Sequence, residues 1–218
     1  FKQMSDVYAD GERVYAQAGA LLSKTAAVAC EASLTGMEFA SGIPGTLGGA
    51  LRMNAGAYGG EMKQIVESAE VLTSEGEVLN LTNEELGMGY RTSVIAKNDY
   101  VALSAVLKLE KGDRQEIRAY MEDLKERRVT KQPLEFGSAG STFKRPEGYF
   151  AGKLIQDSGM QGYRVGDAQV SEKHCGFVIN RGNATAAEVM QLMKDVADRV
   201  EEKFGVRLEP EVRRIGEF

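Results

Sequence analysis

The chain has 218 residues, of which 43% are hydrophobic and 27% charged, a composition that is typical of a globular protein and too apolar for a disordered one. Its formal net charge of −5 argues against nucleic acid as the main partner, but it leaves room for a small basic site that binds a nucleotide diphosphate. No stretch approaches the roughly 20 apolar residues of a membrane-spanning helix, and the first residues do not form a signal peptide. We therefore expect a cytoplasmic protein with no membrane partner.

The residue types that usually hold metals are scarce in this chain. His174 is the only histidine, and Cys30 and Cys175 form no CxxC pair. We expect no metal site, and structural or peripheral roles for His174 and Cys175. The absence of a disulfide framework also fits a reducing compartment.

The first half of the chain predicts several strands and one helix. Residues 14–18 are typical of a strand that ends at Gly19, and the alanine-rich residues 21–34 predict a helix that Gly36 ends. Two apolar runs at 65–73 and 78–82 flank the turn sequence SEGE and predict a β-hairpin. The period-two pattern at 101–109 predicts a core strand with one buried face, formed by Val101, Leu103, Ala105, Leu107 and Leu109.

The second half predicts two amphipathic helices around a loop-rich stretch. The first has its apolar stripe at Ile117, Tyr120, Met121 and Leu124. The second has its stripe at Val189, Leu192, Met193, Val196 and Val200, with a Thr185–Glu188 capping box and a stop at Gly205. Between them, residues 132–166 show little periodicity, and such loops often carry chemistry.

Residues 41–60, SGIPGTLGGALRMNAGAYGG, contain seven of the chain's 25 glycines. Pro44 suits the first turn of a short helix, inside which Gly45, Gly48 and Gly49 would each cost about 1 kcal/mol relative to alanine. Such a cost suggests that a ligand approaches the backbone, and free amides at a helix start bind phosphate well. Tight helix–sheet packing or a mobile loop would explain the same composition. Neither GxGxxG nor GxxxxGK[ST] is present.

The same segment resembles the flavin-binding signature of the UDP-N-acetylenolpyruvoylglucosamine reductase (UDP-N-acetylmuramate dehydrogenase) family. Further matches follow in family order, namely GYRTS at 89–93, GSTFKRP at 140–146, AGKLIQDSG at 151–159 and LEPEVRRIGE at 208–217. The compact GSTFKRPEGYFAGKLI stretch resembles the second type of the family. The resemblance implies an α+β fold, with part of a vanillyl-alcohol-oxidase-type FAD-binding domain at 1–131, a returning strand at 205–218, and a substrate-binding domain at 132–204.

The resemblance also implies an activity. NADPH reduces bound FAD, and the flavin hydride then reduces the enolpyruvyl ether of a UDP-sugar to a lactyl ether, which gives the peptidoglycan precursor UDP-N-acetylmuramate. The small-molecule partners would be NADPH and the sugar nucleotide, with no protein partner inferred. Hydride addition leaves negative charge beside the substrate carboxylate, which needs a cationic partner and a proton.

Matching motifs carry the family's functional residues onto this chain. Ser141 aligns with the serine that donates the proton, Arg91 with the active-site arginine and Glu211 with the active-site glutamate. In a strand at 206–212, Val206, Leu208 and Val212 would share one face and Glu211 would lie on the other. The predicted substrate-binding residues are Lys144, Arg145, Tyr149 and Lys153. The predicted cofactor-binding residues are Ser41, Gly42, Ile43, Pro44, Gly45, Thr46, Gly48, Gly49, Asn54, Gly56, Ala57 and Tyr58.

Complete members of the family begin with an N-terminal subdomain that helps to hold FAD, and no match to it is found before the flavin signature. We therefore expect these 218 residues to bind FAD weakly or not at all and to turn over negligibly alone. Two alternatives stay open. One is a carbohydrate or alcohol oxidase of the same flavin-binding architecture, and the other is a non-catalytic module that binds a sugar nucleotide.

Overall fold

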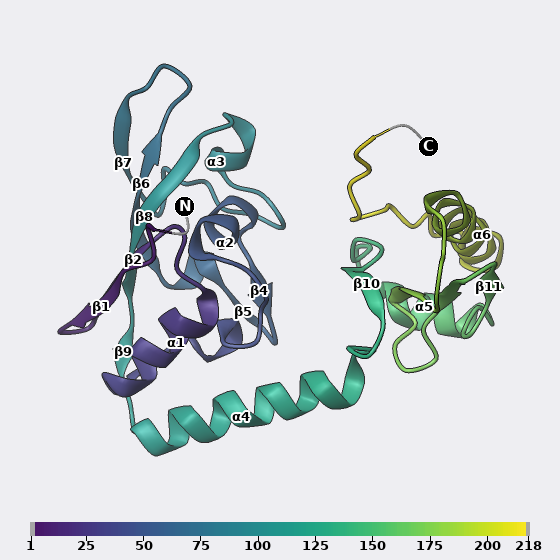
Figure 1. Ribbon diagram of the computed structural model, residues 1–218, viewed down its shortest axis with the longest axis horizontal. Helices are drawn as coiled ribbons and strands as arrows, with labels where there is room; N and C mark the ends of the chain where they lie inside the picture. The colour runs from purple at the N-terminus through teal and green to yellow at the C-terminus, as the bar shows by residue number, and fades with distance from the viewer. Residues whose placement is uncertain (1–2, 217–218) are drawn as a thin grey trace. The chain divides into compact units, whose positions relative to one another are not determined.

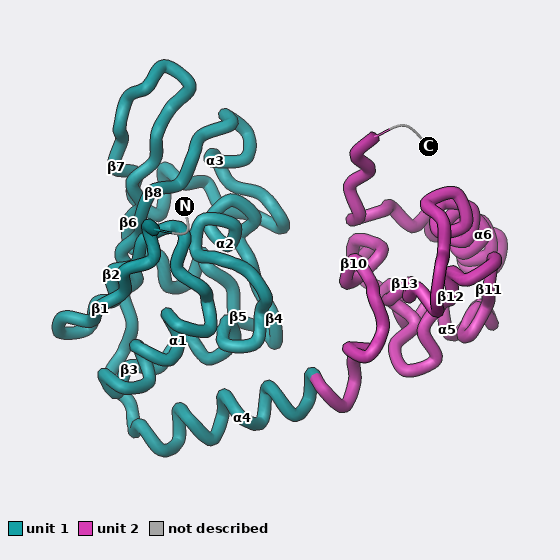
Figure 2. The backbone as a smooth tube through the Cα atoms, viewed as in Figure 1, with its two compact units in different colours: residues 1–128 teal, residues 129–218 magenta. Residues whose placement is uncertain are grey.

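A computed structural model describes residues 3–216 of the chain. These residues form two compact units, residues 1–128 and 129–218 (Figure 2). The division between them falls within helix α4, Arg114–Lys131. It lies three residues before the boundary expected at Lys131. In the described part of the chain, no helix is both long and apolar enough to span a membrane. Each unit is described separately below.

The first unit is built on a five-stranded antiparallel sheet with the strand order β1-β2-β8-β6-β7 (Figure 1). Its strands are β1 Val7–Asp10, β2 Arg13–Gln17, β6 Val66–Leu72, β7 Val78–Thr82 and β8 Val101–Lys108. Its helices are α1 Leu22–Glu31, α2 Leu47–Met53 and α3 Val94–Lys97, with 3₁₀ turns η1 Glu38–Ala40 and η2 Met62–Gln64. Two short pairs, β3 Leu34–Thr35 with β9 Glu110–Lys111 and β4 Gly56–Ala57 with β5 Gly60–Glu61, complete it.

The predicted hairpin is confirmed as β6–β7, but the predicted face of β8 is wrong in its first half. The pairing of β8 with β6 shifts between Glu70 and Val71, which is a β-bulge that takes Leu103 out of register. Ala102 is buried in place of Val101, which is 39% exposed. Beyond the bulge, Ala105 and Leu107 are buried as predicted.

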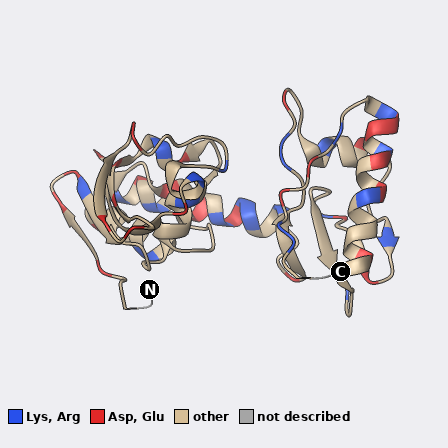
Figure 3. Ribbon diagram, turned by 90° about the horizontal axis from the view of Figure 1, so that it is seen from above, with Lys and Arg blue, Asp and Glu red and all other residues tan. Residues whose placement is uncertain are grey.

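Helix α4 buries a narrow stripe. Ile117 and Leu124 are buried and Met121 is partly buried, whereas Tyr120, which was predicted to share the stripe, is 45% exposed. The rest of the helix carries both acidic and basic residues (Figure 3). Arg114 and Arg118 both pair with Glu31 of α1, which fixes the start of α4 against the first unit.

The second unit contains an antiparallel sheet with the order β10-β13-β12-β11 and two helices. The elements are β10 Gly137–Ser141, α5 Ala151–Asp157, β11 Arg164–Val165, β12 Ala168–Val170, β13 Phe177–Asn180 and α6 Ala186–Phe204. Leu192, Met193, Val196 and Val200 of α6 are buried in its core, as predicted. The capping box and the left-handed Gly205 at the end of α6 are also confirmed.

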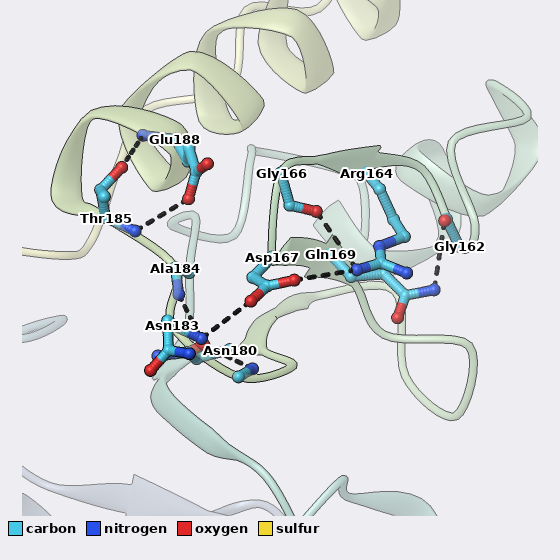
Figure 4. Close-up of polar contacts among 11 residues, drawn as sticks. Gly162, Arg164, Gly166, Asp167, Gln169, Asn180, Asn183, Ala184, Thr185 and Glu188 are labelled. Carbon is cyan, nitrogen blue, oxygen red and sulfur yellow. Dashed lines mark hydrogen bonds and ion pairs between the residues drawn. The ribbon is translucent and has the colours of Figure 1, made fainter.

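A polar network holds the β11–β12 turn beside the start of α6 (Figure 4). Asp167 accepts a hydrogen bond from the Asn183 amide at 2.9 Å and pairs with Arg164 at 3.3 Å. Gly166 has a φ of +55°, and a Cβ there would collide with the carboxylate of Glu188. The Glu188 carboxylate accepts the Thr185 amide in the capping box at the start of α6, so glycine at position 166 leaves the space that this carboxylate occupies.

The expected returning strand at 205–218 is not formed in the described residues. After Gly205 the chain is irregular, with one bridge between Phe143 and Pro210, and Leu208 is buried in the core of the second unit. Residues 206–216 therefore belong to the second unit and not to the flavin domain. Glu217, the last residue of the LEPEVRRIGE motif, lies outside the described residues.

Candidate functional site

The glycine-rich segment of residues 41–60 begins with a loop that runs into α2. Thr46 is the residue before the helix, so Pro44 lies ahead of α2 and not in its first turn as predicted. The amides of Leu47 and Gly48 donate to the carbonyls of Ala20 and Ala18 at 2.8 and 2.9 Å. The prediction that free amides at this helix start bind phosphate is therefore wrong for these two groups, since the protein itself uses them.

Three of the glycines in this segment are required by packing. A Cβ on Gly48 would lie 3.1 Å from the Cβ of Ala18, and one on Gly60 would lie 2.5 Å from the ring of Phe39. A Cβ on Gly56 would lie 2.7 Å from the carbonyl oxygen of Gly60. Tight packing therefore accounts for these three positions, and at Gly48 it is the predicted alternative of helix–sheet packing, since Ala18 directly follows β2.

Three other glycines of the segment face open space. A Cβ on Gly45 or Gly59 would meet nothing within 4 Å, and one on Gly49 would meet only the Thr46 hydroxyl at 3.9 Å. Gly45 and Gly59 have positive φ, and Gly59 forms with Tyr58 the turn between β4 and β5. Gly49 has neither a packing nor a backbone reason to be glycine. It lines a cavity of about 260 Å³ together with Thr46, Arg52 and Tyr100.

These open positions fit a cofactor that approaches the backbone of the segment. An alanine at Gly49 would add a methyl group to the cavity wall and would favour the helix. Gly42, Pro44, Gly45 and Tyr58 are exposed, and Ile43, Thr46 and Ala57 are half-buried. The residues predicted to bind FAD thus form a partly exposed surface of the first unit.

Ser41 and Asn54 of the predicted cofactor set are engaged within the protein. The Ser41 hydroxyl donates to the Glu38 carbonyl at 2.8 Å. Asn54 is 2% exposed, has a left-handed backbone with a φ of 43°, and accepts the Lys63 amide at 2.8 Å. Its side-chain amide donates to Glu61 at 3.0 Å and to the carbonyl of Gly89 at 3.1 Å. Asn54 therefore anchors the neighbouring loops.

The GYRTS loop, which carries the predicted catalytic Arg91, is tied to the end of α2. Besides the contact from Asn54 to Gly89, the buried Ser93 hydroxyl donates to the Arg52 carbonyl at 3.0 Å. Arg91 is half-buried, has a φ of +55°, and its guanidinium lies 5.4 Å from the centre of the Tyr90 ring. A non-glycine residue in this conformation is strained, and such strain is concentrated at functional sites.

In the second unit, the backbone brings the predicted Ser141 and Glu211 to neighbouring positions. The Glu211 amide donates to the carbonyl of Thr142, the residue after Ser141, at 2.9 Å. The hydroxyl of the buried Thr142 accepts the Val178 amide at 3.0 Å, which fixes this crossing to β13. Ser141 is exposed and Glu211 is half-buried. Arg91 lies in the first unit, and Ser141 and Glu211 lie in the second.

The predicted substrate-binding residues Lys144, Arg145, Tyr149 and Lys153 are all exposed or half-exposed on the second unit. Lys144 pairs with Glu209 at 3.0 Å and Lys153 with Asp157 at 2.6 Å. Arg145 donates to the Tyr149 carbonyl at 3.2 Å and stacks 4.0 Å from the centre of the Phe150 ring. This loop therefore displays cations and aromatic rings together, a combination suited to a nucleotide diphosphate.

His174 and Cys175 show the features of structural groups. Burial lowers the pKa of His174, whose Nδ1 accepts the Gly176 amide at 3.1 Å and whose ring contacts Phe177 edge-on. Burial raises the pKa of the Cys175 thiol, which makes it a poor nucleophile. Among the residues that the structure describes, no group of three or more His, Cys, Asp or Glu side chains could hold a metal.

The sequence patterns predicted no functional role for Arg128, which contacts the glycine-rich segment. Its guanidinium lies 5.6 Å from the centre of the Tyr58 ring, and its Nε is buried. A signal was present in the sequence, because spacing of 117, 121, 124 and 128 places this arginine on the buried stripe of α4.

Comparisons with known proteins agree with both units. Residues 132–215 match the family model of the UDP-N-acetylenolpyruvoylglucosamine reductase C-terminal domain, and residues 1–82 match that of an FAD binding domain. A UDP-N-acetylenolpyruvoylglucosamine reductase of Agathobacter rectalis is 60% identical over 94% of this chain and 65% of its own length. One of Alkaliphilus oremlandii is 61% identical over 99% of this chain and 71% of its own length. The chain thus spans about two thirds of these relatives.

A solved structure gives the same answer for the fold. The UDP-N-acetylenolpyruvylglucosamine reductase of Thermus caldophilus superposes with a TM-score of 0.79 at 38% identity, over 91% of this chain and 71% of that one. The α+β fold, with an FAD-binding domain followed by a reductase C-terminal domain, is therefore confirmed. The chain belongs to the UDP-N-acetylenolpyruvoylglucosamine reductase family.

Proposed function

We propose that this chain supplies the substrate-reducing machinery of an FAD-dependent oxidoreductase that converts UDP-N-acetylglucosamine enolpyruvate to UDP-N-acetylmuramate. NADPH is the proposed hydride donor, the cytoplasm the proposed location, and peptidoglycan precursor synthesis the proposed role. The proposal is carried by the 61% identity to a reductase of this name across 99% of the chain. The neighbouring backbones of Ser141 and Glu211 add support, because both side chains are assigned to the reacting end of the substrate and must therefore lie close together.

The surface that would hold FAD is the glycine-rich segment. Gly45, Gly49 and Gly59 leave its backbone open to a close approach, and Thr46 and Arg52 add polar groups to the cavity beside Gly49. When bound and reduced, the flavin supplies the hydride. Asn54 and Ser93 hold the Arg91 loop against this segment, so the cofactor surface and Arg91 share one rigid support.

Three residues are assigned to the substrate's reacting end. The Ser141 hydroxyl gives a proton to the carbon beside the carboxylate after hydride addition to the terminal methylene carbon. The permanent charge and forked donors of Arg91 suit the carboxylate on which negative charge develops. A free serine is a weak acid, so Ser141 needs polarisation by its neighbours. Glu211 is assigned to the active site together with Ser141 and Arg91.

Lys144, Arg145, Tyr149 and Lys153 are proposed to bind the diphosphate and uridine of the substrate. Lys144 and Lys153 already have carboxylate partners at the surface, and exposed pairs of this kind are worth at most about 1 kcal/mol. A diphosphate can therefore compete for these two lysines at little cost. No nucleic acid, membrane or protein partner is proposed.

We further propose that these 218 residues alone bind FAD weakly and turn over negligibly, because they span only 65% to 71% of their relatives' length. The test is a pair of calorimetric titrations of the isolated chain, one with FAD and one with UDP-N-acetylglucosamine enolpyruvate. We expect saturable binding of the sugar nucleotide and weak binding of FAD. Purification of a stoichiometric yellow flavoprotein would contradict the FAD part, and no binding of the sugar nucleotide would contradict the function.

A further inference from the structure

The end of α4 brings a charged side chain against the glycine-rich segment. Arg128 is half-buried, and its Nε is enclosed without a hydrogen-bond partner among the described residues. Its guanidinium carbon lies 5.6 Å from the centre of the Tyr58 ring. A buried donor that makes no hydrogen bond is costly and rare in folded proteins, so this position of Arg128 calls for an explanation.

Gly42 at the start of the same segment makes room for this side chain. A Cβ on Gly42 would lie 3.1 Å from the Nε of Arg128 and 3.5 Å from its guanidinium carbon. Gly42 does not have a positive φ, so the backbone conformation does not require glycine there. The space for the guanidinium is the reason the structure offers. Arg128 thus lies between the two ends of the segment, at Gly42 and at Tyr58.

The other arginines of α4 differ from Arg128 in having carboxylate partners. Arg114 and Arg118 pair with Glu31, and Arg127 pairs with Asp123 at 2.7 Å. Within the described residues, no ion pair or hydrogen bond is formed by Arg128, which instead lies on the buried stripe of the helix with Leu124. Among residues 3–216, this permanent charge therefore has no anionic counterpart.

We propose that Arg128 is a cofactor-binding residue whose guanidinium donates to an electron-rich oxygen of the bound flavin cofactor. This inference rests on the proposed function, because it takes the glycine-rich segment as the FAD surface. Two parts of FAD carry oxygens of this chemistry, the diphosphate and the pyrimidine edge of the flavin ring. The planar fork of arginine suits either of them.

The test compares Arg128→Met with Arg127→Met in a reductase of the relatives' full length that carries this sequence, called here the full-length reductase. Methionine keeps the apolar stem of the side chain and removes the donors. Arg127, one residue away, is the matched control because it is exposed and paired with Asp123. The measurements are the Kd values for FAD and riboflavin, the two-electron reduction potential of bound FAD, and the denaturant midpoint of the flavin-free protein.

A contact to the diphosphate predicts that Arg128→Met weakens FAD binding by about 10- to 100-fold and leaves riboflavin binding unchanged. A contact to the ring predicts weaker binding of both flavins. If that contact favours the reduced ring tenfold, its loss also lowers the potential by about 30 mV. Either pattern supports the inference, provided that Arg127→Met behaves as the parent protein does.

Two results would overturn the inference. One is an Arg128→Met protein with unchanged affinities and potential. The other is a flavin-free Arg128→Met protein that unfolds at a clearly lower denaturant concentration than Arg127→Met, which would show a structural role. If the parent protein itself holds no FAD, the proposed function fails. If the parent protein binds FAD but no more tightly than Arg128→Met does, only the inference about Arg128 fails.

Discussion

Thr142 connects the two proposed active-site residues of the second unit. It follows Ser141 in the chain, its carbonyl accepts the Glu211 amide at 2.9 Å, and its hydroxyl accepts the Val178 amide at 3.0 Å. The two partners of the buried Thr142, Glu211 and Val178, lie on different segments of the chain. Because Val178 belongs to β13, the position of Ser141 is set by the sheet as well as by its own loop. These contacts hold the backbone next to Ser141 in place, and a proton donor needs such a fixed position.

Replacement of Ser141 by alanine tests its role as proton donor. In the full-length reductase, Ser141→Ala should leave the reduction of bound FAD by NADPH unchanged, since no substrate proton transfer occurs there. Reoxidation of the flavin by the enolpyruvyl substrate should slow by about 10² to 10⁴, the usual contribution of a general acid. Rapid-mixing absorbance traces separate the two half-reactions. Unchanged reoxidation would remove Ser141 from the mechanism.

His174 predicts a pH dependence of stability. Burial lowers its pKa in the folded protein, so between the folded and unfolded pKa values the unfolded chain binds more protons. The free energy of unfolding should therefore fall as the pH drops through the ordinary histidine pKa of about 6.5, and it should be independent of His174 above that value. Denaturant titrations between pH 5 and 8 should show a smaller loss in His174→Gln than in the parent protein. Equal losses in the two proteins would contradict the assignment.

At the level of elements, period and capping patterns predicted the long elements well. The capping box of α6, its buried stripe and the β6–β7 hairpin follow from local sequence, because each is decided by residues a few positions apart. The bulge in β8 depends on its pairing with β6, and the irregular chain after Gly205 depends on packing of Leu208 into the second core. Neither contact has a local signature.

The candidate site divides in the same way. The motifs indicated Ser141, Arg91 and Glu211, but the availability of groups is a tertiary property. The amides of Leu47 and Gly48 are used by Ala20 and Ala18, which are distant in sequence, so a free phosphate-binding helix start could not be judged from the glycine pattern. Arg128 was detectable as a charge on an apolar stripe, but its contact with Gly42 was not.

A substitution at Gly49 separates the role of the α2 surface in FAD binding from its contribution to protein stability. Gly49→Ala should stabilise the flavin-free full-length reductase by about 0.5–1 kcal/mol, because alanine favours a helix and the Cβ meets nothing closer than 3.9 Å. It should weaken FAD binding by about 5- to 100-fold if the cofactor occupies this space, since an inserted methyl group costs about 1–3 kcal/mol. Denaturant unfolding and flavin fluorescence titration measure the two effects.

Gly137→Ala is the matched control, because Gly137 lies in the second unit, is not among the glycines with a positive φ, and would bring its Cβ no closer than 4.0 Å to its nearest neighbour, Asn180. It should leave FAD affinity unchanged. A Gly49→Ala protein that is more stable and binds FAD as tightly as the parent protein would show that the cofactor does not approach α2 at this position.

For the molecule as a whole, the two units have separate hydrophobic cores. One core is formed by residues from Val14 to Leu109 and the other by residues from Phe143 to Leu208. The matches to an FAD binding domain at 1–82 and to a reductase C-terminal domain at 132–215 fall on either side of α4. The proposed cofactor surface and Arg91 therefore belong to the unit with the first core, and Ser141, Glu211 and the proposed diphosphate-binding residues belong to the unit with the second.

The most direct test of the account is a single-turnover experiment on the full-length reductase. NADPH is first used to bleach the flavin without oxygen, and UDP-N-acetylglucosamine enolpyruvate is then added. We predict that the flavin absorbance returns and that one equivalent of UDP-N-acetylmuramate forms for each flavin reoxidised. A flavin that stays reduced in the presence of this substrate, but is reoxidised when oxygen is admitted, would contradict the proposed function.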